Sequence, residues 1–262
     1  MERRLFIAIA CVLAAGALTS RAQITNPAAS PGPTNLIAIT NAADGLVTNM
    51  PMDVAIKEIS PGVFALGDVM IDRRERTVSF PARFNLDVGA MEYFLVTSWG
   101  KIHESILKTD TQPYRIHVAM LLLGAQGVGT NLPPDMPPPG GFLSHPANIP
   151  IPGDKLAVEV GWTNGTMEVR HRASELIYNR KQQAPMSADD WSYNGSIMID
   201  NGFLAQADGS IISLATDWAA MVNNNGPGHD DDSDWTANTN NLPPTNAVVR
   251  VTFRLKNQTT GR

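Results

Sequence analysis

The chain of 262 residues contains a single cysteine, Cys11, which precedes the part that is predicted to fold. Without a second cysteine, the folded part can form no disulfide bond. It can hold no cysteine-ligated iron–sulfur cluster and no c-type haem, and it has no thiol nucleophile. The fold must therefore be stabilised by a hydrophobic core, which a chain of this length can form.

The first 22 residues have the pattern of a secretory signal peptide. Arg3 and Arg4 form a short basic region, an apolar run covers 5–18, and small residues form a cleavage site near Ala22. The apolar run is too short to span a membrane. The sequence therefore predicts an exported protein, periplasmic or extracellular after cleavage. The two arginines leave the twin-arginine route open beside the general secretory route.

Residues 23–45 are rich in Ala, Pro, Asn, Thr and Gly, which predicts a flexible spacer, and 46–262 is predicted to form a single domain. The net charge of −5 argues against a nucleic-acid partner, because phosphate contacts require Lys and Arg. No second apolar run reaches membrane length, so no membrane span is expected in the mature protein. The expected partner is an unknown envelope protein or a small ligand.

Strand-like runs dominate the predicted domain. Residues 91–107 are expected to form a hairpin with its turn near Gly100-Lys101, and Asn164-Gly165 predicts another hairpin. The apolar period changes at about 111–124, where a buried helix is predicted. The expected fold class is α+β: mainly antiparallel strands and hairpins with this one strong helix.

A proline-rich loop is predicted at 131–153. This segment contains eight prolines, which exclude a helix or an interior strand. It is expected to be an extended insertion between the helix and the next strand. A loop of this length is either functional or a flexible insertion, and both interpretations stay open.

The segment His103-Glu104-Ser105 contains the ingredients of nucleophilic hydrolysis. On a strand, His103 and Ser105 would share a face with Cα atoms roughly 6–7 Å apart, and Glu104 would point to the opposite face. The three neighbours therefore cannot form a catalytic triad among themselves. Glu104 lies between two isoleucines, so on a buried face it would need a partner, in a structural pair or in a site.

His117 lies in the apolar helical segment. A lone histidine in such a place is more often a hydrogen-bonded core residue than a ligand. If His103 and His117 converge, a metal site or an acid–base site around them and Glu104 becomes an alternative.

A second candidate site is the acidic segment with Asp230, Asp232 and Asp234 at alternate positions, a spacing typical of the start of a calcium-binding loop. The match then fails, because Trp235 stands where an EF-hand needs Gly and Asn241 stands where it needs Glu. The segment is interpreted as a solvated acidic loop, and a weak divalent-cation site is the alternative.

Two blocks of the sequence resemble the YdjY-domain family of exported bacterial proteins, of planctomycete and verrucomicrobial type. The first is a strand, a Lys-x-His-Glu-Ser element and a helix, and the second comprises WSYNGS, GFLAQADGSIISL and DDSDWTANTNNLPP. The resemblance covers roughly 52–255. The matching residues of the first block are Lys101, His103, Glu104, Ser105, His117, Ala119, Leu121, Leu122, Leu123 and Gly124.

The resemblance implies an exported domain of uncharacterised activity, and it supplies no established catalytic residues. Iron–sulfur labels carried by some family members do not suit this chain, which lacks cysteine after Cys11. The sequence therefore predicts a non-catalytic binding or structural module of the bacterial envelope. The alternative is a metal-dependent or acid–base enzyme that uses His103, Glu104 and His117, with Ser105 in the same cluster. No cofactor is predicted beyond a divalent cation, calcium, at the acidic loop.

Overall fold

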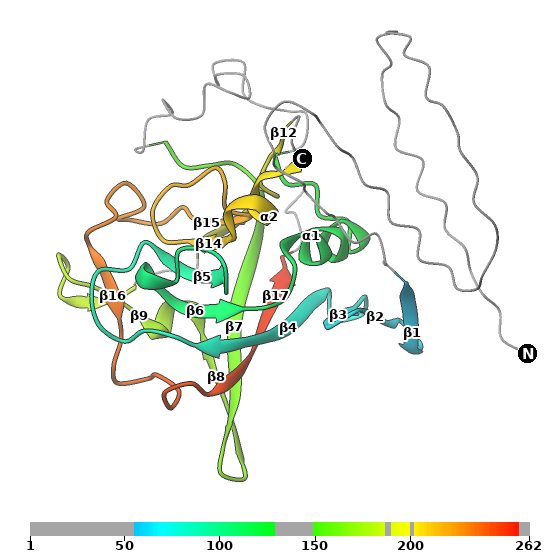
Figure 1. Cartoon of the computed structure of the whole chain (residues 1–262), viewed down its shortest axis with the longest axis horizontal. Helices are drawn as coiled ribbons and strands as arrows, with labels where there is room; N and C mark the ends of the chain where they lie inside the picture. Colours follow the sequence, from blue (N-terminus) through cyan, green and yellow to red (C-terminus); the bar gives the residue numbers. More distant parts are fainter. Residues whose placement is uncertain (1–54, 129–148, 187–189, 200–201, 257–262) are drawn as a thin grey trace, which may run out of the picture. The chain divides into compact units, whose positions relative to one another are not determined.

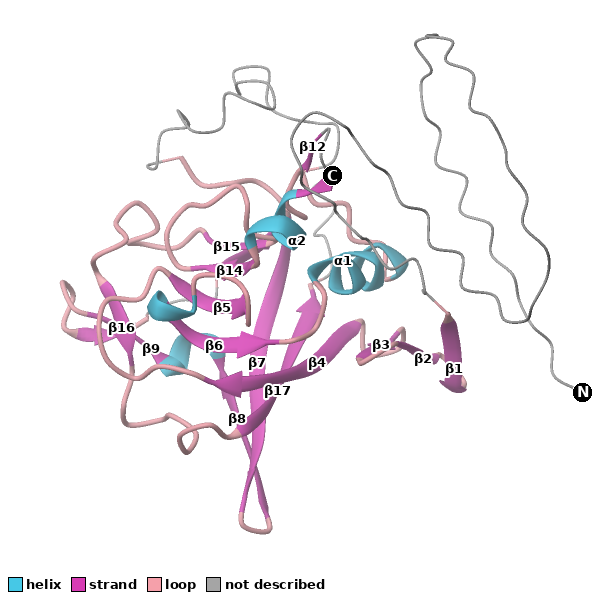
Figure 2. Ribbon diagram, in the orientation of Figure 1, coloured by secondary structure: helices cyan, strands magenta, loops and turns pink. Residues whose placement is uncertain are grey.

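β-Strands dominate the part of the chain that the computed structural model describes, which comprises residues 55–128, 149–186, 190–199 and 202–256. Twelve strands form one large sheet, and two small sheets accompany it. Figure 2 shows strands in most of this region and only short helical segments. The strands are β1 (Ile56–Ser60), β2 (Val63–Leu66), β3 (Val69–Asp72), β4 (Thr77–Phe84), β5 (Tyr93–Thr97), β6 (Ser105–Thr109), β7 (Asp154–Asn164), β8 (Met167–Arg172), β9 (Ile177–Asn179), β10 (Ala184–Pro185), β11 (Trp191–Tyr193), β12 (Met198–Ile199), β13 (Gly202–Phe203), β14 (Ser210–Ser213), β15 (Val222–Asn224), β16 (Trp235–Ala237) and β17 (Val248–Leu255).

Eight of these strands close into a barrel. Their order around the ring is β4–β17–β7–β11–β15–β14–β5–β6, and β6 pairs with β4 to complete it (Figure 1). The closing pairs are Arg83 with Lys108 and Phe84 with Leu107. Two neighbouring pairs are parallel, β14 with β15 and β5 with β6, and the others are antiparallel.

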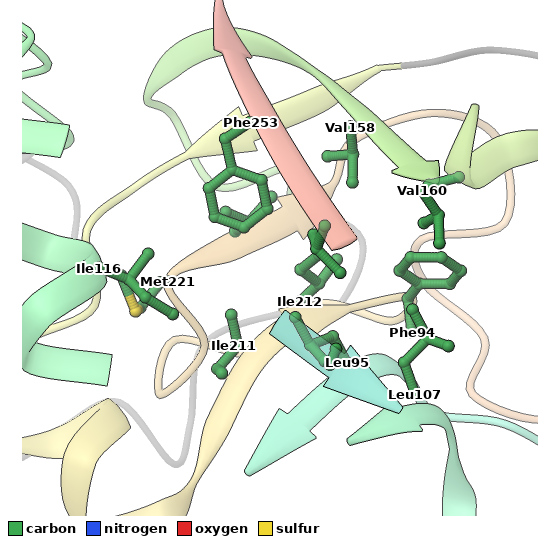
Figure 3. Close-up of a cluster of buried hydrophobic side chains, with 14 of the residues drawn as sticks. Phe94, Leu95, Leu107, Ile116, Val158, Val160, Ile211, Ile212, Met221 and Phe253 are labelled. Carbon is green, nitrogen blue, oxygen red and sulfur yellow. The ribbon is translucent and has the colours of Figure 1, made fainter. Parts of the chain in front are cut away.

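Apolar side chains fill the interior of the barrel. Residues 249, 251, 253 and 255 of β17 alternate with more exposed neighbours, so one face of this strand is buried. Phe80 and Phe253 meet edge to face, with ring centroids 5.4 Å apart. Figure 3 shows buried side chains from β5, β6, β7, β14 and β17 gathered in one cluster. A barrel of eight strands has an interior that side chains can fill, and this one is packed in that way.

The predicted α+β class is wrong, because strands account for 44% of the structure and helical residues for 12%. The predicted helix is present as α1 (Pro113–Leu122), but it is shorter than 111–124 and is not buried on most sides. It buries Pro113, Ile116, Ala119 and Met120, whereas Leu121 is 47% exposed. The barrel closes on itself and buries its strands against one another, so it does not need a covering helix.

The other helical segments are short. They are α2 (Leu204–Asp208) and the 3₁₀ segments η1 (Ile102–Glu104) and η3 (Ala173–Leu176). In the described part of the chain, none of the helices combines the length and the apolar character that crossing a membrane requires.

The predicted hairpin at 91–107 is also wrong. β5 and β6 pair in parallel, with Leu95 opposite Leu107, and η1 lies in the connection between them. The hairpin predicted from Asn164-Gly165 is confirmed, since β7 and β8 pair antiparallel around that turn and Gly165 has a φ of +62°. The signal peptide, the spacer at 23–45 and the proline-rich loop up to 148 lie outside the described residues.

Candidate functional site

The connection between β5 and β6 carries the Lys-x-His-Glu-Ser element. Because η1 replaces the strand expected there, the side chains of this element do not alternate between two faces. Lys101 is partly buried, the His103 side chain is 77% exposed, and Ser105 is fully buried at the start of β6. The element therefore distributes its polar groups to different surroundings.

Lys101 begins a chain of hydrogen bonds that leads into the protein. Its Nζ donates to Tyr93 Oη over 2.7 Å, and the Tyr93 hydroxyl donates to Asp217 Oδ2 over 2.9 Å. The backbone N–H of Ala219 donates to Asp217 Oδ1 over 2.8 Å. One buried tyrosine on β5 thus bridges a lysine and a carboxylate from a distant part of the sequence.

Burial dominates the electrostatics of this chain. It raises the pKa of Asp217, while the Ala219 N–H, the Tyr93 hydroxyl and the Lys101 charge oppose that rise. Burial, followed by the negative charge of Asp217, raises the pKa of Tyr93 as well. The Tyr93 hydroxyl therefore keeps its proton and acts as the hydrogen-bond donor to Asp217.

Glu104 has a second carboxyl group beside it. The Glu92 backbone N–H donates to the Glu104 carbonyl oxygen over 3.1 Å, and the Glu104 carboxyl acts electrostatically on that of Glu92. Burial, followed by the charge of Glu104, raises the pKa of Glu92; Lys101 lowers it and Asp232 raises it further. His103 Nε2 lies 3.8 Å from Glu104 Oε2. The result is an acidic pair whose nearest cation is Lys101, with a surface histidine at its edge.

Ser105 is committed to the backbone of its own strand. Its hydroxyl donates to the Leu107 carbonyl oxygen over 2.7 Å, and its side chain is fully buried. His103 and Glu104 lie beside each other, whereas in the described part of the chain no hydrogen bond joins the Ser105 hydroxyl to either of them.

His117 lies on α1 and is hydrogen-bonded to a neighbouring strand. Its Nδ1 is 2.7 Å from the hydroxyl of Tyr193 on β11, and its ring centroid is 4.9 Å from that of Phe203. Burial lowers the pKa of His117 to about 4. The neutral ring therefore accepts a hydrogen bond from Tyr193, whose own pKa is raised by burial. In the described part of the chain, no hydrogen bond or ion pair joins His117 to His103 or Glu104.

The acidic segment lies beside a cation from the turn after β9, and Asp231 also accepts hydrogen bonds from the Ser233 N–H and hydroxyl over 2.9 and 2.6 Å. Lys181 Nζ lies 3.9 Å from Asp231 Oδ2 and 3.8 Å from Asp234 Oδ2. Asp234 is buried, Asp230 is exposed, and Asp232 acts electrostatically on Glu92. No three His, Cys, Asp or Glu side chains in the described ranges are grouped so that they could hold a metal ion.

Sequence reasoning missed four residues of this region: Glu92, Tyr93, Asp217 and Asn85. The Asn85 side chain donates to the carbonyl oxygens of Ile102 and Ser105, over 2.6 and 2.8 Å, and so holds η1 against the end of β4. Tyr93 and Asp217 are 124 positions apart, so no local spacing could have paired them. Asn85 offered a weak signal, as a polar residue at the end of an apolar strand.

Comparison with known proteins yields one match. The family model of the YdjY domain matches residues 69–254, a span that contains every residue of the site described above. No curated protein and no solved structure matched the chain.

Proposed function

Because the chain belongs to the YdjY domain family, we propose that it is an exported, non-catalytic binding or structural module of the bacterial envelope. One observation carries the non-catalytic part: three polar side chains of the first family block, those of Lys101, Ser105 and His117, are hydrogen-bonded within the fold. Lys101 bonds Tyr93, Ser105 bonds its own strand, and His117 bonds Tyr193. A catalytic group instead needs hydrogen-bond reach to a reacting atom.

A second function has one specific observation in its favour. The pKa of Glu92 is raised by burial and by the neighbouring charge of Glu104, and carboxyls with a perturbed pKa are found at acid–base sites. Such a site would use His103 at its edge, and an enzyme of this kind would be either metal-dependent or an acid–base catalyst. His117, on α1, would join it only if the protein rearranged its bond to Tyr193.

Metal content separates the proposed function from the metal-dependent form of the second. We expect elemental analysis of the purified chain to find no stoichiometric divalent metal. The melting temperature should be the same in chelator and in added calcium, because Asp231 and Asp234 lie beside Lys181. A stoichiometric metal that is lost in His103→Ala or Glu104→Gln would overturn the non-catalytic proposal. If added calcium does raise the melting temperature, loss of that rise in Asp230→Asn or Asp232→Asn would assign the calcium site to the acidic segment.

Export is tested separately. Protein recovered from the envelope fraction of the producing cells should begin at Gln23, because the small residues before it form the cleavage site. N-terminal sequencing gives the answer directly. An intact Met1 on protein that stays inside the cell would contradict the proposed location.

A further inference from the structure

A pocket lies on the outside of the barrel at the seam where β6 meets β4. It encloses about 170 Å³. Figure 1 shows the two strands side by side below α1. Its charged and hydroxyl-bearing lining residues are Asp68, Arg83, Ser98, Lys108, Thr109, Asp110 and Thr111. None of them belongs to the family element or to the acidic pair.

Two like charges face each other in this pocket. Arg83 on β4 and Lys108 on β6 are direct cross-strand partners, so their side chains project from the same face. Like charges directly opposite each other in a sheet are destabilising. On its other side, Arg83 is opposite Val248, which is 58% exposed and brings no compensating charge. The seam that closes the barrel thus carries an unfavourable pair.

The acids of the pocket have hydrogen-bond and ion-pair partners other than these two cations. Asp68 accepts a hydrogen bond from the Thr111 hydroxyl, and its Oδ1 is 3.3 Å from Arg115 Nη1. Asp110 accepts a hydrogen bond from the Ser98 hydroxyl over 2.6 Å. Within the described ranges, neither Arg83 nor Lys108 forms an ion pair or a side-chain hydrogen bond.

The unused groups of the pocket are therefore donors. The Arg83 guanidinium has five N–H groups in a planar fork, and the Lys108 ammonium has three. The hydroxyls of Ser98 and Thr111 are already used as donors to Asp110 and Asp68. An oxyanion between the guanidinium and the ammonium would satisfy both and remove their repulsion.

We propose that this pocket binds a small phosphate-type anion, either free or as the phosphoryl group of a small molecule. Each cation can bind an oxygen of the same phosphate group, and arginine and lysine are both phosphate-binding side chains. The carboxylates of Asp68 and Asp110 in the lining reduce its positive charge and repel an extended polyanion, so the ligand is small. This inference rests on the proposed binding function and names its ligand class.

The test is titration calorimetry of the full chain with inorganic phosphate and with glycerol phosphate, at constant ionic strength. We expect saturable binding at one site, weakened at least tenfold in Arg83→Gln and in Lys108→Gln. Arg73→Gln removes an exposed arginine from the turn before β4 and should leave binding unchanged. Tighter binding of glycerol phosphate than of free phosphate would identify a phosphoryl group as the ligand, and the reverse order would identify the free ion.

Thermal unfolding provides the folding control. Without phosphate, both variants should melt at or above the wild-type temperature, because each removes half of a repulsive pair. With phosphate, only the wild type and Arg73→Gln should gain melting temperature. The proposal fails if the wild type shows no saturable binding, or if Arg73→Gln weakens binding as much as the pocket variants. If binding fails in this way and the purified chain contains no metal, the phosphate site is wrong but the proposed non-catalytic function is not contradicted.

Discussion

At the scale of single residues, the pair of Glu92 and Glu104 concentrates negative charge in a partly buried place. Burial and Glu104 raise the pKa of Glu92, and Asp232 adds to the same effect. Lys101 is the cation that opposes them, and its Nζ is also bound to Tyr93. A carboxylate in these surroundings is less stable in the folded chain than in the unfolded chain at neutral pH.

Glu92→Gln is therefore expected to raise the free energy of unfolding at pH 7. The folded pKa of Glu92 lies above its ordinary value of 4.5, so its favourable contribution is complete only below pH 4.5 and is lost as the pH rises. The advantage of the variant should consequently disappear below pH 4.5. Urea unfolding at pH 7 and pH 4 measures this. Glu159→Gln, a partly exposed carboxyl on β7, is the control, and an equal gain there would contradict the prediction.

The contribution of His117 to stability should depend on pH in a different range. Its folded pKa of about 4 lies below the ordinary value of 6.5, so the stability that it contributes is present above pH 6.5 and is lost as the pH falls toward 4. Between these limits, the wild type should lose stability relative to His117→Asn by on the order of 3 kcal/mol. If the free energy of unfolding changes with pH equally in the two proteins across this range, the His117 ring is not neutral and buried.

The sequence was informative about His117 and less so about Glu104. An isolated histidine in an apolar segment favoured a hydrogen-bonded core residue, and the structure provides Tyr193 as the partner. Glu104 was expected to need a partner if the face it shares with Ile102 and Ile106 is buried; Ile106 is buried, whereas Ile102 is 37% exposed. The partner Glu92 could not be predicted, because it depends on the path of the chain between β5 and β6.

At the scale of elements, Asn85 holds the connection between two parallel strands. A parallel pair cannot be joined by a tight hairpin turn, so the chain from 98 to 104 must cross from the end of β5 to the start of β6. Asn85 donates to two carbonyl oxygens of this crossing, those of Ile102 and Ser105. The Gly100-Lys101 signal marked a real turn, but the turn opens a crossover and not a hairpin.

Asn85→Ala should loosen this crossing without unfolding the barrel. Two carbonyl oxygens lose their side-chain donor, which costs about 1–3 kcal/mol. Amide hydrogen exchange over 100–104 should become faster, while exchange in β17 stays slow. Asn241→Ala removes a comparable bond, from the Asn241 side chain to the Glu175 carbonyl oxygen, and should leave 100–104 unchanged. Unaltered exchange at 100–104 in Asn85→Ala would show that the side chain does not hold the segment.

At the scale of the whole molecule, the fold depends on pairings that are distant in sequence. Hairpins between neighbouring strands, such as β7 with β8, were predictable from the turn residues. The position of β17 between β4 and β7, and the pairing of β4 with β6, join segments that no local pattern connects. The strand content was therefore visible in the sequence, whereas the closure that makes the fold a barrel was not.

Closure also explains why the family element matters for the structure. It begins next to β5 and ends in β6, the last strand of the ring, and Thr109 of β6 donates a hydrogen bond to the Pro81 carbonyl oxygen of β4 over 2.6 Å. Residues that fix the path from β5 to β6 therefore fix the strand that completes the barrel.

A cysteine pair across β4 and β6 tests this closure most directly. In a chain with Cys11→Ser, Arg83→Cys and Lys108→Cys would place two thiols on directly opposed residues. Opposed antiparallel residues have Cα atoms about 4.5–5.5 Å apart, within the range of a disulfide. After mild oxidation, we predict a monomer that has lost two hydrogens by mass and no longer reacts with an alkylating reagent.

The matched control combines Lys108→Cys with Arg73→Cys, in the turn before β4, and both of its thiols should remain reactive. If the Arg83→Cys and Lys108→Cys pair also stays fully reactive in folded monomer, β6 does not meet β4 and the barrel is not closed.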